Sequence, residues 1–175
     1  MPNWCMNTVI AKHPDPAKME ALKEAFKKEI FFEHILPIGE WEYEKACNTW
    51  STKWEASNIS WMHFTDDGRN HLDISFESAW SPPEEVYQKM IADGWDVTAY
   101  FYEPGMGFVG KFGTNKFGTD LGGMYGELYE MDDAIPAELV EMFNIQEMYD
   151  DSEYELVYND NDDTYIVKER IEEEE

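Results

Sequence analysis

A glycine-rich stretch carries the residues whose spacing comes closest to a motif that performs chemistry. Residues 105–110 satisfy G-x-G-x-x-G, and residues 105–112 match all but the last position of the phosphate-binding pattern G-x-x-x-x-G-K-[ST]. Both patterns require a helix after the loop, because the helix N-terminus binds the phosphate. The residues that follow Lys111 are typical of a hairpin, and Phe112 replaces the hydroxyl that would hold magnesium. We therefore assign these glycines to a hairpin rather than to nucleotide binding.

Residue types that ligate metals are present but scattered. The four histidines and two cysteines show no C-x-x-C, H-x-x-H or H-E-x-x-H spacing. Residues 160–163 resemble the start of a calcium loop, but Tyr165 stands where that loop needs glycine and Ile171 where it needs glutamate. No Ser-His-Asp or Cys-His arrangement can be argued from spacing. The sequence therefore predicts a non-enzymatic protein that uses no metal or cofactor.

Aromatic residues indicate a second kind of site. Trp50, Thr52 and Trp54 share one face of an expected strand, and Tyr100 and Tyr102 share one face of another. Aromatic rings on an open sheet can stack single-stranded bases. Such binding also needs cations along the phosphate path, and the chain has 13 basic residues against 38 acidic ones. We expect most of these rings to pack in the core or against the sheet.

Acidic residues are concentrated towards the C-terminus. The net charge is −25, and residues 127–175 contribute −17 of it, from 19 acidic and 2 basic residues. A field this strong and localised affects partners and association rates rather than the fold. It argues against nucleic acid as a direct ligand and favours a basic protein surface. Two alternatives are a solubilising surface and the acid coat of a halophilic protein, which would be spread over the whole chain.

Hydrophobic periodicity predicts the elements that would position these residues. Strands are expected at 3–11, at 72–78 and at 95–102, and one interrupted strand is expected from two segments, 50–54 and 59–64. Helices are expected from Asp15-Pro16 to about Glu29, and from Ser81 to Gly94, with residues 31–49 irregular. This order predicts an α+β fold with a ferredoxin-like βαββαβ antiparallel sheet and both helices on one face.

The rest of the chain is predicted to extend that domain. We expect a ferredoxin-like domain at 1–126, which includes a glycine-rich hairpin at 103–126 with eight of the eleven glycines. Residues 127–171 should form an acidic unit, with a helix at 136–148 and a hairpin at 154–167, and 172–175 a disordered acidic end. There is no long apolar run and no signal-peptide pattern, so we expect a cytoplasmic protein without membrane contact. Cys5 and Cys47 would then be reduced thiols.

Four short passages resemble a known family. They are residues 3–7 (Asn-Trp-Cys-Met-Asn), 48–54 (Asn-Thr-Trp-Ser-Thr-Lys-Trp), 79–83 (Ala-Trp-Ser-Pro-Pro) and 102–106 (Tyr-Glu-Pro-Gly-Met). Together they resemble an uncharacterised group of phage, prophage and plasmid proteins, the YubB-type or Api-like family, described as ferredoxin-like. The resemblance spans residues 3–112 and implies a mobile-element origin and the same fold. It implies no activity and no catalytic residues.

The first functional hypothesis is a phage or mobile-element accessory protein that takes part in host takeover or anti-defence. Its acidic surface would imitate nucleic acid and inhibit a basic, nucleic-acid-binding host protein. Tyr149 and Tyr154 would anchor the contact, because aromatic residues beside carboxylates suit an interface. The carboxylates expected to carry the field are Asp132, Asp133, Glu138, Glu141, Asp150, Asp151, Glu153 and Glu155.

The second hypothesis is a module that binds a small ligand, a nucleotide or RNA between the sheet and the glycine-rich hairpin. Its site would use polar and aromatic residues of the four passages that have no evident packing role. These residues are Asn7, Trp50, Lys53, Trp80, Tyr102 and Glu103.

Overall fold

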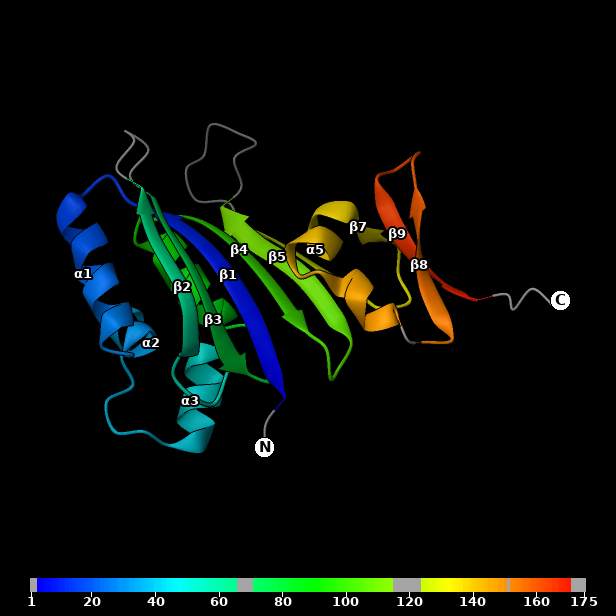
Figure 1. The fold of residues 1–175 in the computed structure, drawn as a ribbon. Coiled ribbons are helices and arrows are strands. Elements are labelled where there is room, and N and C mark those ends of the chain that lie inside the picture. The colour runs from blue at the N-terminus through cyan, green and yellow to red at the C-terminus, as the bar shows by residue number, and fades with distance from the viewer. Residues whose placement is uncertain (1–2, 66–70, 115–123, 151, 171–175) are drawn as a thin grey trace, which may run out of the picture.

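The computed structural model describes residues 3–65, 71–114, 124–150 and 152–170 (Figure 1). It is a mixed α+β structure with two antiparallel sheets. The predicted acidic end at 172–175 and the hairpin tip beyond Thr114 lie outside the described residues. No helix in the described ranges is long and apolar enough to cross a membrane.

The larger sheet has six strands in the order β2-β3-β1-β4-β5-β6, and the smaller has three in the order β7-β9-β8. The strands are β1 (Trp4–Lys12), β2 (Ser57–Thr65), β3 (His71–Ala79), β4 (Asp96–Glu103), β5 (Phe108–Thr114), β6 (Met124–Glu130), β7 (Ile135–Pro136), β8 (Tyr154–Asn159) and β9 (Thr164–Glu169). The helices are α1 (Pro16–Lys27), α2 (Phe31–Ile35), α3 (Tyr43–Trp50), α4 (Glu84–Ala92), α5 (Ala137–Met142) and a 3₁₀ helix, η1 (Ile145–Tyr149).

Strand β1 lies in the middle of the larger sheet, paired with β3 and β4. Its predicted alternation is confirmed, since Cys5, Val9 and Ala11 are buried while Ile10 is exposed. We call the face with Cys5 and Val9 the inner face and the opposite one the outer face. Helices α1 and α4 cover the inner face (Figure 1).

Aromatic side chains fill the core between the helices and the inner face. The Phe26 and Phe31 rings stack with centroids 4.1 Å apart, and both contact Phe76 of β3. Each fully buried large apolar side chain contributes about 1.5–3 kcal/mol of transfer free energy. This core holds α1 and α2, neither long enough to be stable alone, against the sheet.

Two local helix signals behave as the sequence predicts. The Asp15 side chain caps α1 by accepting a hydrogen bond of 2.9 Å from the Ala17 backbone N–H. Gly94 follows α4 with φ of +90°, a left-handed conformation that glycine adopts without steric cost. Both signals depend only on residues within one turn of the helix end.

The prediction that residues 31–49 are irregular is wrong, because they contain α2 and α3. Helix α2 has only five residues, and its N-terminus is capped from a distant part of the chain. The Glu55 carboxylate accepts hydrogen bonds from the backbone N–H groups of Phe32 (2.6 Å) and Glu33 (3.0 Å). Such a cap has no local sequence signal, so the helix could not be read from periodicity.

The predicted strand at 50–54 is also wrong. Trp50 is the last residue of α3, and Ser51 then turns the chain in a left-handed conformation with φ of +65°. The Trp50 indole lies in the inner core and donates a hydrogen bond of 2.8 Å to the Leu36 carbonyl oxygen. The buried residues Ala46 and Trp50 are four positions apart, which is the spacing of one helix face. The Trp-x-x-x-Trp pattern suggested a strand instead and hid this spacing.

Two predicted helix boundaries differ from the structure. Helix α4 begins at Glu84 behind Pro83, and Ser81 does not cap it, because its hydroxyl donates to the Ser51 carbonyl oxygen instead. The single helix predicted at 136–148 is divided into α5 and η1 at Asn144, whose φ is +51°. The division turns Ile145 into the core that Leu139 and Val140 also fill.

The two cysteines are free thiols in different surroundings. Cys5 is fully buried in β1, and burial raises the pKa of its thiol well above the usual range. Cys47 lies part-exposed on α3. Cys5 is therefore an inert core residue.

Close packing explains the glycine pattern at 105–110. A Cβ atom at Gly110 would overlap the Glu127 carbonyl oxygen of β6 and approach the Phe101 ring to 2.6 Å. Gly107 has φ of +70° in the turn between β4 and β5. Gly110 is followed by strand residues of β5 rather than by a helix, so the phosphate-loop geometry is absent here.

Replacing Gly110 by alanine should lower the free energy of unfolding by about 1–3 kcal/mol, the usual cost of overpacking a filled site. Gly126→Ala is the matched control, because its Cβ would meet only the Phe112 ring at 3.3 Å, which can shift. Urea unfolding of the two variants measures the difference. Equal effects at the two positions would contradict this packing explanation.

Glu55→Gln should change how stability depends on pH. Burial raises the pKa of the Glu55 carboxyl above its usual 4.5, against the opposing effect of three backbone N–H hydrogen bonds. The folded protein therefore binds this proton more tightly than the unfolded chain does, and the contribution of Glu55 to stability is full below pH 4.5 and lost as the pH rises through the native pKa. The unfolding free energy of the wild type minus that of Glu55→Gln should fall as the pH rises from about 4 to 7. A flat difference would contradict the prediction, and Glu44→Gln on the exposed face of α3 controls for the loss of one charge.

Candidate partner-binding surface

The acidic part of the chain forms a compact unit on the outer face of the larger sheet. This C-terminal unit, residues 131–170, contains α5, η1 and the smaller sheet (Figure 1). Its contact with the larger sheet is a second hydrophobic core, separate from the first. The buried members of this core are Tyr102 and Val109 from the larger sheet and Ile135, Leu139, Val140, Ile145 and Leu156 from the unit.

One ion-pair network links the unit to the larger sheet. The Lys111 ammonium of β5 lies 2.6 Å from the Glu138 carboxylate of α5 and 3.4 Å from Glu127 of β6. Partial burial would lower the pKa of Lys111, but the hydrogen bond to Glu138 and both carboxylates outweigh it and raise the pKa. Lys111 therefore stays charged and orients α5 on the sheet.

Arg170 closes the unit at the end of β9. Its guanidinium donates hydrogen bonds to the carbonyl oxygens of Tyr149 (2.7 Å) and Asp150 (3.0 Å), where η1 ends. Its backbone N–H donates to the Glu153 carbonyl oxygen at 2.8 Å. A planar guanidinium suits this paired contact, which a lysine could not reproduce.

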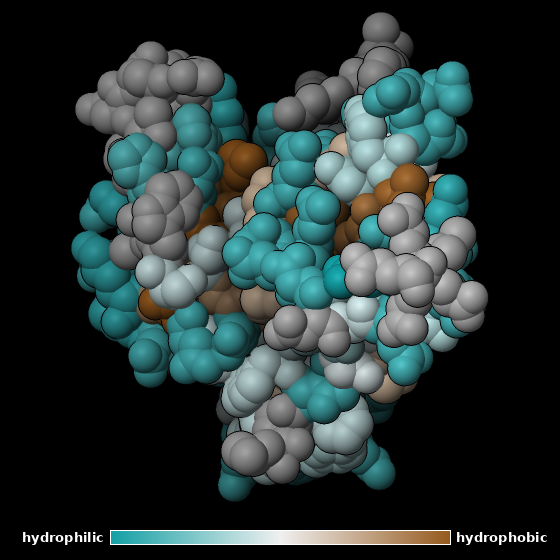
Figure 2. All heavy atoms as spheres, turned by 45° about the vertical axis from the view of Figure 1, so that its right-hand side comes forward, coloured by the Kyte–Doolittle hydropathy of each residue, from teal (hydrophilic) through white to brown (hydrophobic). Residues whose placement is uncertain are grey.

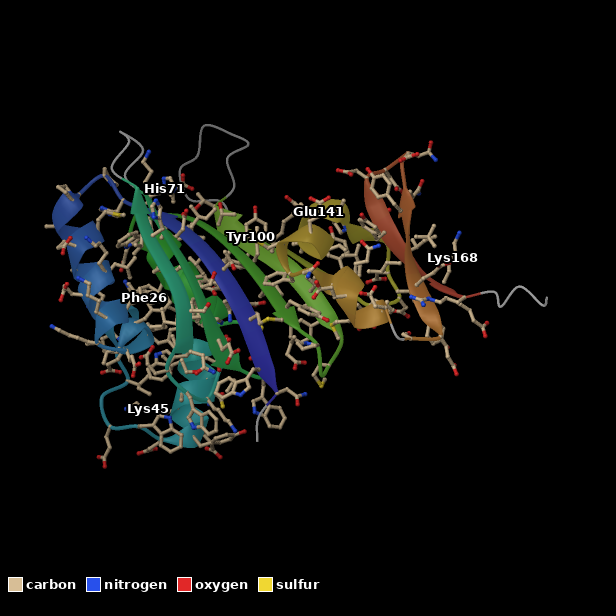
Figure 3. All side chains as sticks on the ribbon, in the orientation of Figure 1. Phe26, Lys45, His71, Tyr100, Glu141 and Lys168 are labelled. Carbon is tan, nitrogen blue, oxygen red and sulfur yellow. The ribbon has the colours of Figure 1, made fainter. Side chains whose placement is uncertain are left out.

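All predicted partner-binding carboxylates that the structure describes are exposed, and Asp151 lies outside the described residues. Asp133 accepts a hydrogen bond from the Glu130 N–H, and Glu138 pairs with Lys111. The other five form no ion pair within the described part of the chain; they are Asp132, Glu141, Asp150, Glu153 and Glu155. Glu141 lies on α5 and the cation Lys168 on β9 (Figure 3). The surface thus carries negative charge that is not paired within the described part of the chain.

Exposed apolar side chains lie among these carboxylates. Met148 is 53% exposed at the end of η1, and Tyr154 is 47% exposed at the start of β8. Met142 and Tyr158 are exposed to a similar degree. Tyr149 instead packs partly against the second core, so of the two predicted anchors Tyr154 presents more of its ring. Figure 2, with this side turned forward, shows hydrophobic patches bordered by hydrophilic residues, an arrangement typical of contact surfaces.

The six residues of the alternative ligand site do not form one site. Asn7 is buried on the inner face, where its amide nitrogen donates to the Cys5 carbonyl oxygen and to Ser78, and its oxygen accepts from the Tyr87 hydroxyl. Trp50 belongs to the inner core. Both side chains have a structural role, so neither is available to a ligand.

The other four residues of that set are in three different places. Tyr102 is buried in the second core on the outer face. Glu103 is fully buried, and its carboxylate accepts hydrogen bonds from the Gly105 and Met106 N–H groups, which closes the turn between β4 and β5. Lys53 and Trp80 are the two that meet, with the ammonium 5.2 Å from the indole centroid.

The four passages nevertheless converge at one end of the larger sheet. The Trp80 backbone N–H donates to the Asn3 carbonyl oxygen, and the Thr52 hydroxyl donates to that of Ala79. A Cβ atom at Gly105 would overlap the Asn3 side chain, so the turn after β4 closely approaches the start of β1. Loops that are far apart in the chain therefore build one surface here.

Two residues that hold the C-terminal unit in place, Lys111 and Arg170, were missed by sequence reasoning. The sequence signals for both were weak. Lys111 had appeared only as the lysine of an incomplete phosphate pattern, although it is the counter-ion of α5. Arg170 is one of two arginines in the chain, and that rarity was the only sign of its special role.

Comparison with protein-family models, curated proteins and solved structures gives no match.

The described residues contain no group of three or more histidine, cysteine, aspartate or glutamate side chains placed to hold a metal ion. In the turn before β9, Asp163 accepts a hydrogen bond from Tyr158 and Asp162 one from Thr164.

Arg170→Ala should loosen the C-terminal unit without unfolding the larger sheet. Loss of two charge-assisted hydrogen bonds at an exposed site should cost about 1 kcal/mol. Hydrogen exchange should then accelerate at the amides of β8 and β9 while those of β1 keep their protection. Lys168→Ala removes a neighbouring exposed cation and should leave both sets of amides unchanged. Equal acceleration in the two variants would show that Arg170 acts through charge alone.

Proposed function

We propose that this protein is a non-enzymatic accessory protein of a phage or related mobile element that binds a basic, nucleic-acid-binding host protein in the host cytoplasm. Its acidic surface would occupy the groove that otherwise holds nucleic acid and so inhibit the host protein. A host protein that defends the cell against phage is one such target. The carrying observation is the set of exposed, unpaired carboxylates on ordered elements of the C-terminal unit. These acids would mimic nucleic acid because they present exposed negative charge on helices and strands of one unit.

The order of the elements supports the ferredoxin-like part of the proposal. Strands β2-β3-β1-β4, with α1 and α4 on the inner face, follow the order expected for a βαββαβ unit. Strands β5 and β6 extend that sheet, and the C-terminal unit covers part of its outer face. The four passages that carry the resemblance to the phage and plasmid family converge on one surface.

Electrostatics supports a protein partner of opposite charge. A localised net charge accelerates encounter with a basic surface and repels nucleic acid. Because the second core and Arg170 hold the unit in place, few groups would lose freedom on binding, which favours affinity. Tyr154, Met148 and Met142 would supply the apolar contact that charge alone lacks.

The proposal predicts that neutralising four unpaired carboxylates abolishes capture of basic proteins. In Glu141→Gln/Asp150→Asn/Glu153→Gln/Glu155→Gln, each change removes charge while keeping shape, and the association rate should fall about tenfold or more at low salt. Wild type and variant are immobilised and exposed to bacterial lysate at low and high salt. Wild type should retain basic nucleic-acid-binding proteins that high salt or added DNA releases.

The matched control is Glu40→Gln/Glu42→Gln/Glu44→Gln/Glu85→Gln, which removes the same charge from exposed sites on other elements. It should capture the same proteins as wild type. If both variants lose the captured proteins equally, net charge is responsible and the C-terminal surface is not the site. If neither variant loses them, the proposal is refuted.

A further inference from the structure

Four of the seven tryptophans gather around Lys53 at the end of the larger sheet where the four passages converge. The Lys53 ammonium lies 3.9 Å from the centroid of the Trp54 ring and 5.2 Å from that of Trp80. The Trp4 ring lies 6.1 Å from Trp54, and the Trp41 indole N–H donates a hydrogen bond of 2.9 Å to the Lys53 carbonyl oxygen. We call this set the tryptophan–lysine surface.

These indoles face solvent rather than a core. Trp80 is 52% exposed, Trp41 is 50% exposed and Trp54 is 38% exposed. Large aromatic side chains normally bury most of their area, so a group of three with open faces is unusual on the surface of a small protein. Neither hydrophobic core includes any of the three.

The backbone at Trp80 is held in an unfavourable conformation. Its φ of +77° lies in the left-handed region, which is a genuine outlier for a bulky residue. The conformation is energetically unfavourable and persists because the Trp80 N–H is bonded to the Asn3 carbonyl oxygen at 2.9 Å. The strain places the indole over Lys53, where it stabilises nothing in either core.

The positive charge of Lys53 is left without a carboxylate partner among the described residues. The half-buried Glu55 and the fully buried Glu103 direct their carboxylates to backbone N–H groups instead. In a chain of net charge −25, an ammonium that lies over two indole rings retains its N–H donors for another acceptor.

We infer that the tryptophan–lysine surface binds a small planar aromatic anion of the nucleoside monophosphate class. The base would stack on the open indole faces, as bases do on aromatic side chains, and the phosphate would accept hydrogen bonds from the Lys53 ammonium. A cationic ligand is disfavoured because Lys53 already occupies the space between two rings. A polynucleotide is disfavoured because its many phosphates meet one cation and a strongly negative protein. This site uses no residue of the acidic surface. Ligand binding here is therefore independent of whether the protein binds the proposed partner.

Titration of the full-length protein with adenosine monophosphate, followed by calorimetry and by the NMR signals of the indole N–H groups, tests the inference. The indole signals of Trp54 and Trp80 should shift at about 5 mM nucleotide, enough to reveal a millimolar dissociation constant. Adenosine should shift the same signals but bind about tenfold more weakly, because it lacks the charged acceptor.

Two lysine variants separate this site from general charge effects. Lys53→Met keeps most of the apolar stem and should weaken binding of the monophosphate about tenfold while leaving that of adenosine unchanged. Lys45→Met removes an exposed cation of α3 and should change neither. Trp54→Ala should weaken both ligands, with the urea midpoint measured to verify folding. The inference is overturned by unshifted indole signals, by an equal effect of both lysine variants, or by tighter binding of a thymidine decanucleotide than of the monophosphate.

Discussion

The outer face of β4 and β5 is the constraint on which the rest of the structure depends. Tyr102 and Val109 lie on this face and are buried, although α1 and α4 cover only the opposite side of the sheet. If these two side chains were exposed to water, the folded state would lose several kcal/mol of hydrophobic stabilisation. A second layer is therefore needed to cover them. The C-terminal unit supplies that layer with Leu139, Ile145 and Leu156, and its position follows from this contact. The acidic surface therefore has a fixed orientation even though like charges within it repel.

Hydrophobic and electrostatic roles are divided between the two sides of the C-terminal unit. The side that contacts the sheet is apolar and contains one ion-pair network, centred on Lys111. The side that faces solvent carries the unpaired carboxylates and the exposed methionine and tyrosine side chains. The carboxylates that repel one another face solvent, where salt screens the repulsion. The unit can therefore stay folded despite its net negative charge. The tryptophan–lysine surface lies on other loops and is built without these acids.

Features encoded within one element could be predicted from the sequence, and features built from distant segments could not. The alternation in β1, β3 and β4, the Asp15 cap and the segregation of acid are all local patterns that the structure reproduces. Helix α2 was missed because its capping residue, Glu55, lies 23 residues from Phe32. The alternative site failed for a related reason: sequence shows that Asn7 and Glu103 are polar, but not that backbone or core partners already satisfy them. The contact between Lys53 and Trp80 depends on the convergence of the four passages, which are distant in the sequence. No single passage encodes this contact.

The division of the C-terminal unit has a consequence for how the protein can evolve. Five buried side chains of the unit hold it on the sheet, and they need only remain apolar and of suitable size. The exposed positions of α5 and β8 make few contacts, so substitutions there change stability little. Mutations could therefore exchange one partner for another at these positions while the scaffold stays constant. Selection by a changing partner would be expected to leave rapid divergence on this surface and slow divergence beneath it.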